Sequence, residues 1–315
     1  MTRLAFVFPG QGSQSVGMGK DLHDRFPVVR DVFDAADCTL GFPLSGLCFD
    51  GPEEDLRLTS NTQPALFTVS VAVLRLLESE GIRPDVVAGH SIGEYAALVA
   101  ARAAAFENAL RLVRRRGELM QAAGVKYPGT MAAVIGLSAD QVREICSRAQ
   151  EVGIVDVANY NSPGQVVISG EARAVEAASG YASEAGAKRV MPLNVSGAFH
   201  SRLMQPAADE LAAELAATAI VDADIPVVAN ATADYVRSAD EIRSALSKQI
   251  AGSVRWEESI LKMVSDGIGG FVEVGPGKVL GGLIKRTTDS ADVANVGDVE
   301  SLEAFVGHWR GAKQS

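Results

Sequence analysis

Residues 86–98 of the chain read Val-Val-Ala-Gly-His-Ser-Ile-Gly-Glu-Tyr-Ala-Ala-Leu. They contain Gly89-x-Ser91-x-Gly93, which is the nucleophile-elbow pattern. The apolar residues before the pattern predict a short buried strand, and residues 94–105 predict a helix rich in alanine and leucine. A strand, a sharp turn and a helix form the setting in which this pattern predicts a reactive serine. The pattern also occurs by chance, so the alternative is a tight turn that contains a serine.

The two glycines of the pattern have a physical role. The turn forces the serine into a strained backbone conformation, so its neighbours must lack side chains if strand and helix are to come close. This geometry lifts the Ser91 hydroxyl clear of the sheet. It also aims the main-chain N–H of Ile92, at the positive end of the following helix, toward an oxyanion.

Composition limits the classes of protein that the chain can belong to. The 315 residues are 47% hydrophobic and 22% charged, which is typical of a soluble globular protein with one large core and a smaller appended domain. No segment approaches the roughly 20 apolar residues that span a bilayer. The start of the chain, residues 1–9, indicates a first strand rather than a signal peptide. The net charge of −10 argues against nucleic acid as a partner.

The cysteines indicate the compartment. Cys38, Cys48 and Cys146 are odd in number and lack the spacing of metal ligands. We interpret them as reduced thiols in a cytoplasmic protein and expect no metal site.

The order of predicted elements indicates an α/β fold. Residues 130–195 alternate in the order β-α-β-β-α-β, which is typical of a ferredoxin-like unit. On both sides of it, strands alternate with helices and predict a mostly parallel sheet. We therefore expect a large α/β-hydrolase-like domain, residues 1–128 and 197–315, with an inserted ferredoxin-like subdomain, residues 129–196.

Caps and breaks in the sequence predict three boundaries of elements. Asn61-Thr62-Gln63-Pro64 predicts a helix start, with a polar cap and a proline in the first turn. A second helix is predicted over residues 106–123, followed by a break from Gly124 to Gly129. The tail after Thr287 is interpreted as short and partly polar.

The sequence offers a base for the serine. His200 is one of four histidines and lies between a predicted strand and a predicted helix. Histidine is suited to take a proton from serine near neutral pH, although a capping or packed histidine is the alternative. His90 adjoins Ser91, but adjacent residues in a tight turn point in different directions, so we interpret it as structural.

Two further stretches leave alternatives open. The glycine-rich loop at Gln11 could supply a second oxyanion N–H, or it could be a simple strand-to-helix turn. The run Arg114-Arg115-Arg116 cannot share one helix face, because neighbouring residues are about 100° apart. One of these arginines could point inward, but the pattern alone favours a solvated basic face.

Four blocks of sequence together resemble the malonyl-CoA:acyl carrier protein transacylase family, the FabD-like acyltransferases of fatty acid and polyketide synthesis. The blocks are Phe8-Pro9-Gly10-Gln11-Gly12-Ser13-Gln14, Gly89-His90-Ser91-Ile92-Gly93-Glu94-Tyr95, Asn159-Tyr160-Asn161-Ser162-Pro163-Gly164-Gln165 and Glu273-Val274-Gly275-Pro276-Gly277. The likeness extends from about Leu4 to Arg286 and is more specific than the elbow alone. It indicates a free-standing enzyme.

The resemblance implies a role for each matching residue. Ser91 would be the acylated nucleophile and His200 its base, oriented by the backbone carbonyl of Gln249 in place of a triad aspartate. Gln11 and Ile92 would supply the oxyanion N–H groups.

The resemblance also implies substrate contacts. Arg116 matches the arginine that pairs with the free carboxylate of malonate, which overturns the solvated-face interpretation for that residue. Phe199 matches the bulky position associated with malonyl over methylmalonyl selection. Asn161 and Arg189 fall where the family lines the pantetheine and nucleotide entrance. Ala198 departs from the family, since proline is common there.

The resemblance implies ping-pong transfer of malonyl from malonyl-CoA to acyl carrier protein. No cofactor is implied, because CoA and phosphopantetheine enter as parts of the substrates. We expect a cytoplasmic monomer that binds neither nucleic acid nor membrane, with a basic rim for the carrier protein. The candidates for that rim are Lys188, Arg189, Lys285 and Arg286. The alternatives are an acyltransferase of polyketide synthesis, a serine thioesterase or patatin-like lipase, and a binding module without chemistry.

Overall fold

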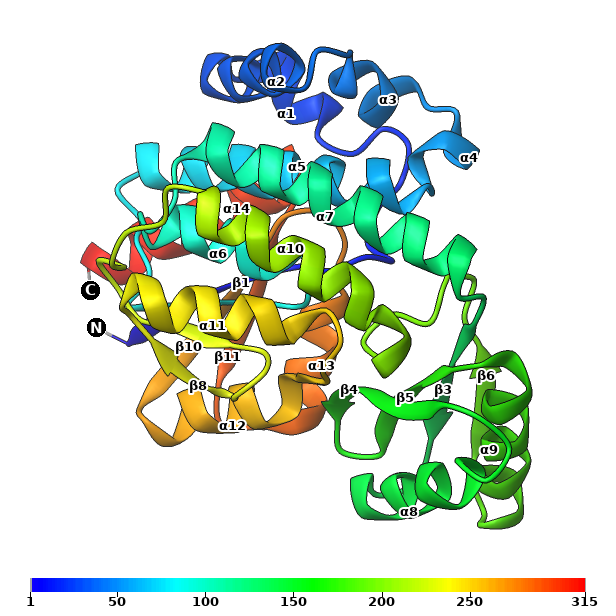
Figure 1. Ribbon diagram of the computed structural model, residues 1–315. Helices are drawn as coiled ribbons and strands as arrows, with labels where there is room; N and C mark the ends of the chain where they lie inside the picture. The colour runs from blue at the N-terminus through cyan, green and yellow to red at the C-terminus, as the bar shows by residue number, and fades with distance from the viewer. Residues whose placement is uncertain (1, 315) are drawn as a thin grey trace.

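The computed structural model describes residues 2–314 and has a mixed α/β fold with two sheets (Figure 1). The larger sheet has the strand order β11-β10-β1-β2-β7-β8, and the smaller has the order β6-β3-β5-β4-β9. The strands of the larger sheet are β1 (Arg3–Phe8), β2 (Val86–Gly89), β7 (Val227–Ala229), β8 (Asp234–Val236), β10 (Ile268–Val274) and β11 (Asp292–Val296). Those of the smaller sheet are β3 (Thr130–Ile135), β4 (Val155–Ser162), β5 (Gln165–Gly170), β6 (Arg189–Pro192) and β9 (Val254–Arg255).

Helices cover both faces of the larger sheet. The helices before the smaller sheet are α1 (Lys20–Arg25), α2 (Pro27–Leu40), α3 (Leu44–Asp50), α4 (Glu53–Leu56), α5 (Thr59–Ser79), α6 (Gly93–Ala100) and α7 (Phe106–Lys126). The smaller sheet carries α8 (Ala139–Ala149) and α9 (Ala172–Glu184). After it come the 3₁₀ turn η1 (Arg202–Met204) and the helices α10 (Gln205–Ala217), α11 (Ala239–Gln249), α12 (Trp256–Ser265), α13 (Val279–Thr287) and α14 (Val299–Gln314). Within the described residues, no helix is both long enough and apolar enough to cross a membrane.

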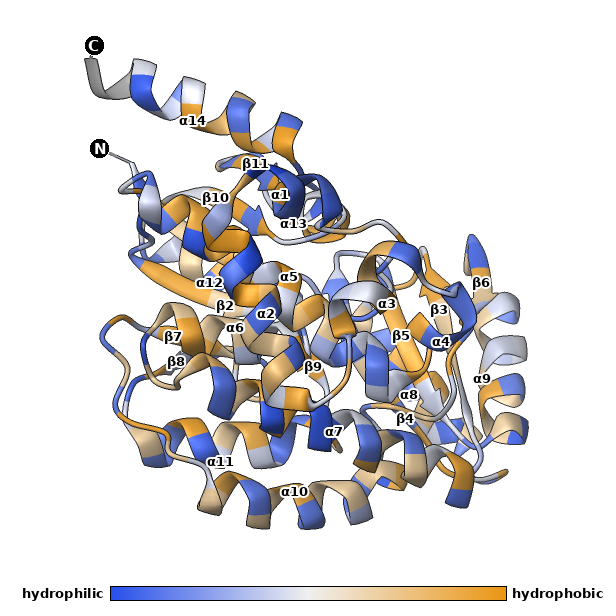
Figure 2. Ribbon diagram, turned by 90° about the horizontal axis from the view of Figure 1, so that it is seen from above, coloured by the Kyte–Doolittle hydropathy of each residue, from blue (hydrophilic) through white to orange (hydrophobic). Residues whose placement is uncertain are grey.

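The predicted parallel sheet is confirmed. β1 lies at its centre and pairs in parallel with β10 on one side and β2 on the other, and only β8 runs antiparallel to its neighbour. β1 is buried on both faces: Phe6 and Phe8 point into the core under α5 and α6, and Ala5 and Val7 point toward α12 and α13. This is why its sequence is a continuous apolar run rather than an alternating one. Figure 2 shows strands such as β2 and β5 in hydrophobic colours, while the outer helices α10 and α11 alternate between hydrophilic and hydrophobic colours along their length.

The smaller sheet contains the predicted β-α-β-β-α-β order and one strand more. β3 pairs antiparallel with β5 and β6, and β5 pairs antiparallel with β4. The added strand, β9, comes from outside residues 129–196 and pairs in parallel with the edge strand β4. The sequence analysis did not predict this strand. Two residues are too short for an alternation of apolar and polar side chains to show.

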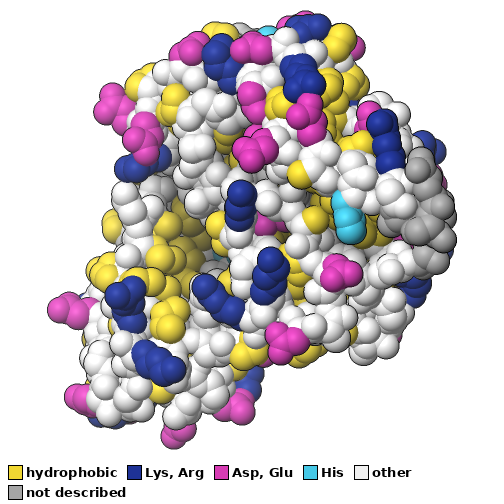
Figure 3. Space-filling view, turned by 180° about the vertical axis from the view of Figure 1, so that it is seen from behind, with side chains coloured by type: hydrophobic (Ala, Val, Ile, Leu, Met, Phe, Trp, Pro, Cys, Tyr) yellow, Lys and Arg dark blue, Asp and Glu magenta, His cyan; other side chains and the backbone are white. Residues whose placement is uncertain are grey.

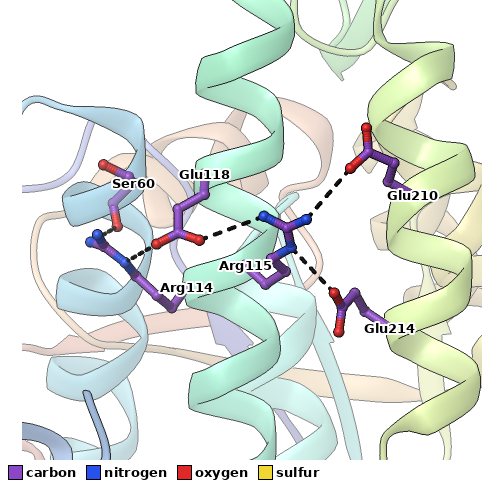
Figure 4. Close-up of polar contacts among 6 residues, drawn as sticks. All are labelled: Ser60, Arg114, Arg115, Glu118, Glu210 and Glu214. Carbon is purple, nitrogen blue, oxygen red and sulfur yellow. Dashed lines mark hydrogen bonds and ion pairs between the residues drawn. The ribbon is translucent and has the colours of Figure 1, made fainter. Parts of the chain in front are cut away.

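Pro64 does not begin its helix. α5 starts at Thr59 and continues through Pro64, so the predicted start was wrong. A proline inside a helix leaves the carbonyl four residues earlier without its usual N–H donor. That carbonyl, Ser60 O, instead accepts a hydrogen bond of 2.9 Å from Arg114 Nη1 on α7 (Figure 4). The tertiary contact replaces the missing intrahelical bond.

Two further boundaries were also wrong. α7 runs past Gly124, where an added Cβ would lie 2.5 Å from Ser196 O, so this glycine allows close packing rather than ending the helix. The tail after Thr287 forms β11 and α14, and Leu302 and Val306 of α14 are buried in the main core. This segment was not recognised because its residues are a mixture of polar and apolar. Such a mixture is expected of an edge strand and of a helix that buries only one side.

Candidate active site

The loop at Ser91 has the geometry of a nucleophile elbow. Ser91 is in the left-handed region with φ of 51°, a strained conformation for a residue with a side chain. A Cβ added to Gly89 would lie 1.9 Å from Gly93 C, and one added to Gly93 would lie 2.1 Å from Phe8 O. No side chain fits at either distance. The two glycines therefore allow β2, α6 and β1 to come together under the serine.

His200 lies within hydrogen-bond distance of Ser91. Its Nε2 is 2.8 Å from Ser91 Oγ, and its Nδ1 is 2.9 Å from Gln249 O and 3.1 Å from Gly252 O. Both carbonyls can only accept, so they place the imidazole proton on Nδ1. Nε2 then presents its lone pair to the serine hydroxyl, as a general base requires. His200 is also in the left-handed region, with φ of 58°.

The surroundings keep His200 neutral. Burial, followed by the positive charge of Arg116, lowers the pKa of His200 from its ordinary 6.5 to about 3. Lowering the pKa of a base favours its unprotonated form at lower pH. The imidazole is therefore able to accept a proton across the whole neutral and mildly acidic range.

We predict that His200 titrates far below an ordinary histidine. In ¹⁵N-correlated NMR spectra recorded between pH 5 and 8, its ring should stay neutral with the proton on Nδ1. The exposed His308, observed in the same spectra, serves as the comparison. A His200 signal that gains a second proton around pH 6.5 would contradict the prediction.

Two residues of the cavity wall have main-chain N–H groups that are available to an oxyanion. Gln11 and Ile92 both line the cavity that contains Ser91. Neither N–H has a hydrogen-bond acceptor among residues 2–314. Ile92 is also the N-cap residue of α6, so its N–H belongs to the positive end of that helix. This pair of donors is suited to a tetrahedral intermediate on Ser91.

Arg116 is completely buried beside the nucleophile. Its Nη1 donates to Gln63 Oε1 at 2.7 Å, and its Nη2 donates to Ser91 Oγ at 3.0 Å and to Gln249 Oε1 at 2.9 Å. Its Nε has no partner among the described residues, and its Cζ lies 5.5 Å from the centre of the Tyr95 ring. Every hydrogen-bond partner of this cation is neutral. Burial of a charge without a hydrogen-bonded countercharge is costly, which marks the guanidinium as a site for an anion.

The other arginines of the run lie at the surface. Arg114 donates to Ser60 O and Glu118, and Arg115 pairs with Glu118, Glu210 and Glu214 (Figure 4). The inward orientation of a single arginine is therefore correct, and its two neighbours lie partly exposed at the surface, where they form ion pairs.

Ser91, His200 and Arg116 line a cavity of about 370 Å³. Phe199 and the apolar side chains of Met120, Met131 and Leu193 form part of its wall. The molecule is hollowed between its two lobes on the face seen in Figure 3, with hydrophobic side chains inside the hollow and Lys and Arg side chains on its rim.

The structure does not bring every predicted residue to this cavity. Asn161 is not part of the cavity wall; its Oδ1 accepts a hydrogen bond of 2.9 Å from Nε2 of His90, which does line the wall. The structural interpretation of His90 is not contradicted, because its Nε2 bonds Asn161 and the imidazole beside the Ser91 hydroxyl is that of His200. Arg189 is exposed on β6 and is not part of the wall.

The chain is similar along almost its whole length to proteins of one family. A model of the acyl transferase domain matches residues 5–312. The chain belongs to the acyl transferase family. It is 49% identical to the malonyl CoA-acyl carrier protein transacylase of Bacillus subtilis, with 97% of each chain covered, and 45% identical to that of Escherichia coli K12, with 96% and 99% covered.

Solved structures of this acyltransferase family agree with the fold. A malonyl-transacylase in complex with a type II PKS acyl-carrier protein is 44% identical, with a TM-score of 0.95 over 98% of this chain and 100% of that chain. An acyl carrier protein S-malonyltransferase from Vibrio cholerae is 45% identical, with a TM-score of 0.94 over 96% of this chain and 100% of that one.

Sequence reasoning missed three polar residues of this site, and it missed the side-chain contacts of a fourth, Gln249. Asn230 accepts from Ser91 N at 2.7 Å and donates to Gly89 O at 2.7 Å, which fixes both sides of the elbow. Gln63 and the side chain of Gln249 hold Arg116, and Glu94 is buried behind them. Asn230 could have been predicted as a site residue, because it directly follows β7, the strand that neighbours β2 in the sheet. Among residues 2–314, no group of three or more His, Cys, Asp and Glu side chains could hold a metal.

Proposed function

We propose that this acyltransferase moves the malonyl group of malonyl-CoA onto the phosphopantetheine thiol of acyl carrier protein, through a malonyl ester on Ser91. The names of its relatives support the substrates. One observation carries the proposal: a fully buried guanidinium, hydrogen-bonded only to neutral groups, 3.0 Å from the nucleophilic hydroxyl. A free carboxylate on the acyl group would supply the missing countercharge.

In the first half-reaction, His200 Nε2 takes the proton of Ser91 Oγ as the oxygen attacks the thioester carbonyl. The developing oxyanion receives hydrogen bonds from the N–H groups of Gln11 and Ile92, each worth about 3–4 kcal/mol by comparison with known oxyanion donors. When the carbon–sulfur bond breaks, His200 returns the proton to the departing CoA thiolate. The Gln249 carbonyl steadies the imidazole while it carries the charge.

The second half-reaction is the reverse with a different thiol. His200 deprotonates the phosphopantetheine thiol, which attacks the ester carbonyl, and the proton returns to Ser91 Oγ. Throughout both halves, Arg116 binds the malonyl carboxylate with two parallel N–H donors. An acetyl group leaves this guanidinium unpaired, so it is disfavoured.

The shape of the cavity supports selection by size. Phe199 lines the wall beside His200, and we propose that it disfavours a methyl branch on the malonyl carbon. Asn161, through His90, and Arg189 at the outer edge are proposed to act toward the pantetheine and nucleotide portion of CoA.

We propose that the acidic carrier protein approaches a basic rim on the smaller lobe and the neighbouring helix α13. The four rim residues are exposed, and Arg286 Nη1 donates to Gln165 Oε1 at 2.7 Å, which joins α13 to β5. The rim consists of Lys188, Arg189, Lys285 and Arg286. No cofactor enters the proposed reaction. We further propose that the protein is a monomer that acts in the cytoplasm. Its pathway would be fatty acid synthesis or, alternatively, polyketide synthesis.

Each of the two parts of the fold has a proposed role in this reaction. We propose that residues 1–128 and 197–315 act as one α/β-hydrolase-like domain that carries Ser91, His200 and Arg116. Residues 129–196 are proposed to act as a ferredoxin-like subdomain that closes one side of the cavity, extended by β9. The strand order β6-β3-β5-β4 supports this description.

Intact-protein mass spectrometry tests the proposal. Mixed with malonyl-CoA alone, the protein should gain the mass of one malonyl group, and Ser91→Ala should gain none. Addition of holo acyl carrier protein should then remove the group from the enzyme and place it on the carrier. Rapid loss of the ester to water without a thiol would instead indicate a hydrolase, and a protein that gains no mass would be a binding module.

A further inference from the structure

The reaction as proposed makes no use of the carboxylate of Glu94, although this group lies next to the site. Glu94 is in the first turn of α6, three residues after the nucleophile, and is only 2% exposed. Its Oε2 accepts from Gln249 Nε2 at 2.5 Å and from the main-chain N–H of Asn230 at 3.3 Å. Burial of a charged carboxylate is unfavourable, because the group loses its hydration. Its presence beside the site therefore indicates a role.

Gln249 connects Glu94 to all three groups that carry the chemistry. Its main-chain carbonyl accepts from His200, and its Oε1 accepts from Arg116 Nη2. Its Nε2 donates to Glu94 Oε2 and, at 2.9 Å, to Ser91 O. Each hydrogen of the amide therefore has an acceptor, and the amide oxygen is left to face the guanidinium.

The opposite orientation of this amide would be strongly unfavourable. If the amide were turned over, its NH₂ group would oppose the donors of Arg116, and its oxygen would oppose both Glu94 Oε2 and Ser91 O. Burial raises the pKa of Glu94 to about 7, against the opposing effect of the hydrogen bonds from Gln249 and Asn230. In its ionised form the carboxylate can only accept hydrogen bonds, so it permits just one orientation of the amide. Glu94 also holds the Asn230 backbone, and the Asn230 side chain in turn holds the N–H of Ser91.

We propose that Glu94 is a positioning residue, whose carboxylate fixes the orientation of the Gln249 amide and thereby the Arg116 guanidinium that recognises the acyl carboxylate. The inference rests on the proposed function, since it concerns the same site. Glu94 does not touch the substrate and acts through Gln249.

The test compares acylation of Ser91 by malonyl-CoA and by acetyl-CoA under single-turnover conditions. Glu94→Ala is expected to lower the ratio of the malonyl to the acetyl rate by about tenfold. Glu94→Met, which keeps the volume but offers no acceptor, should do the same, so either variant that folds is informative. Glu94→Gln, which can still accept from Gln249 Nε2, should keep the ratio within about threefold of the wild type.

A double-mutant cycle shows whether Glu94 acts through Gln249. Gln249→Ala should lower the ratio by a similar factor, and adding Glu94→Ala to it should lower the ratio no further. The control is Glu273→Gln, another fully buried carboxylate, which accepts from Leu280 N and Gly281 N on the far side of the sheet. This control should leave the ratio unchanged.

The outcomes separate the inference from the proposed function. A wild-type protein that is not malonylated would overturn the proposed function. A malonylated wild type together with an unchanged ratio in Glu94→Ala and Glu94→Met would overturn the role of Glu94 alone. Fully additive effects of the Glu94 and Gln249 substitutions would likewise overturn it.

Discussion

Replacement of Arg116 by alanine is expected to lower the rate of malonyl transfer to Ser91 by about a thousandfold, which corresponds to the loss of a buried charge pair. Transfer of acetyl, which has no carboxylate, should fall by less than about tenfold, a loss caused by the removal of the hydrogen bond from Nη2 to Ser91 Oγ. Rapid-quench measurements with labelled malonyl-CoA and acetyl-CoA give both rates.

The neighbouring residue on the same helix provides the matched control. Arg115 pairs with three glutamates at the surface, as Figure 4 shows, and its side chain is 42% exposed. Surface ion pairs contribute about 0–1 kcal/mol, so Arg115→Ala should change neither rate by more than about twofold. Equal losses of malonyl and acetyl transfer in Arg116→Ala would remove the carboxylate-binding role from this residue.

Substitution of Gly93 by alanine should destroy the elbow. The added methyl would lie 2.1 Å from Phe8 O and 2.7 Å from Phe8 C, and a backbone neighbour cannot rotate away as a side chain can. Overpacking typically costs about 1–3 kcal/mol even where side chains can adjust, so a larger loss is expected here. We expect thermal unfolding to begin about 10 °C lower and acylation of Ser91 to become undetectable.

A glycine with open surroundings shows whether the effect is specific. An added Cβ at Gly180, inside α9, meets nothing within 4 Å. Gly180→Ala should therefore stabilise the protein by roughly 0.5–1 kcal/mol and leave acylation unchanged. Normal melting and acylation in Gly93→Ala would contradict the account of the elbow.

The sequence predicted the parts of the site that depend on local geometry. The elbow at Ser91 could be found because two glycines, a strand and a helix are adjacent in the chain. The central strand β1 could be found from its apolar run. The order of the smaller sheet could be found from the spacing of its turns.

Local patterns in the sequence did not predict contacts between distant segments, and those of Ser91, His200 and Arg116 were expected only from the family resemblance. The inward orientation of Arg116 depends on Gln63 and Gln249, which lie on other helices, so helix periodicity favoured the solvent. Pro64 lies inside α5 because Arg114 satisfies the freed carbonyl, and no local pattern reports such a bond. The role of Glu94 could not be predicted either, because its carboxylate accepts hydrogen bonds from donors on distant segments of the chain.

The most direct test of the central claim is a crystal structure of the protein after reaction with malonyl-CoA. The account predicts an ester on Ser91 Oγ, with its carbonyl oxygen between the N–H groups of Gln11 and Ile92. The malonyl carboxylate should accept two hydrogen bonds from Arg116. An adduct on another residue, or a carboxylate directed to solvent with Arg116 still bound to Gln63 and Gln249, would contradict the account.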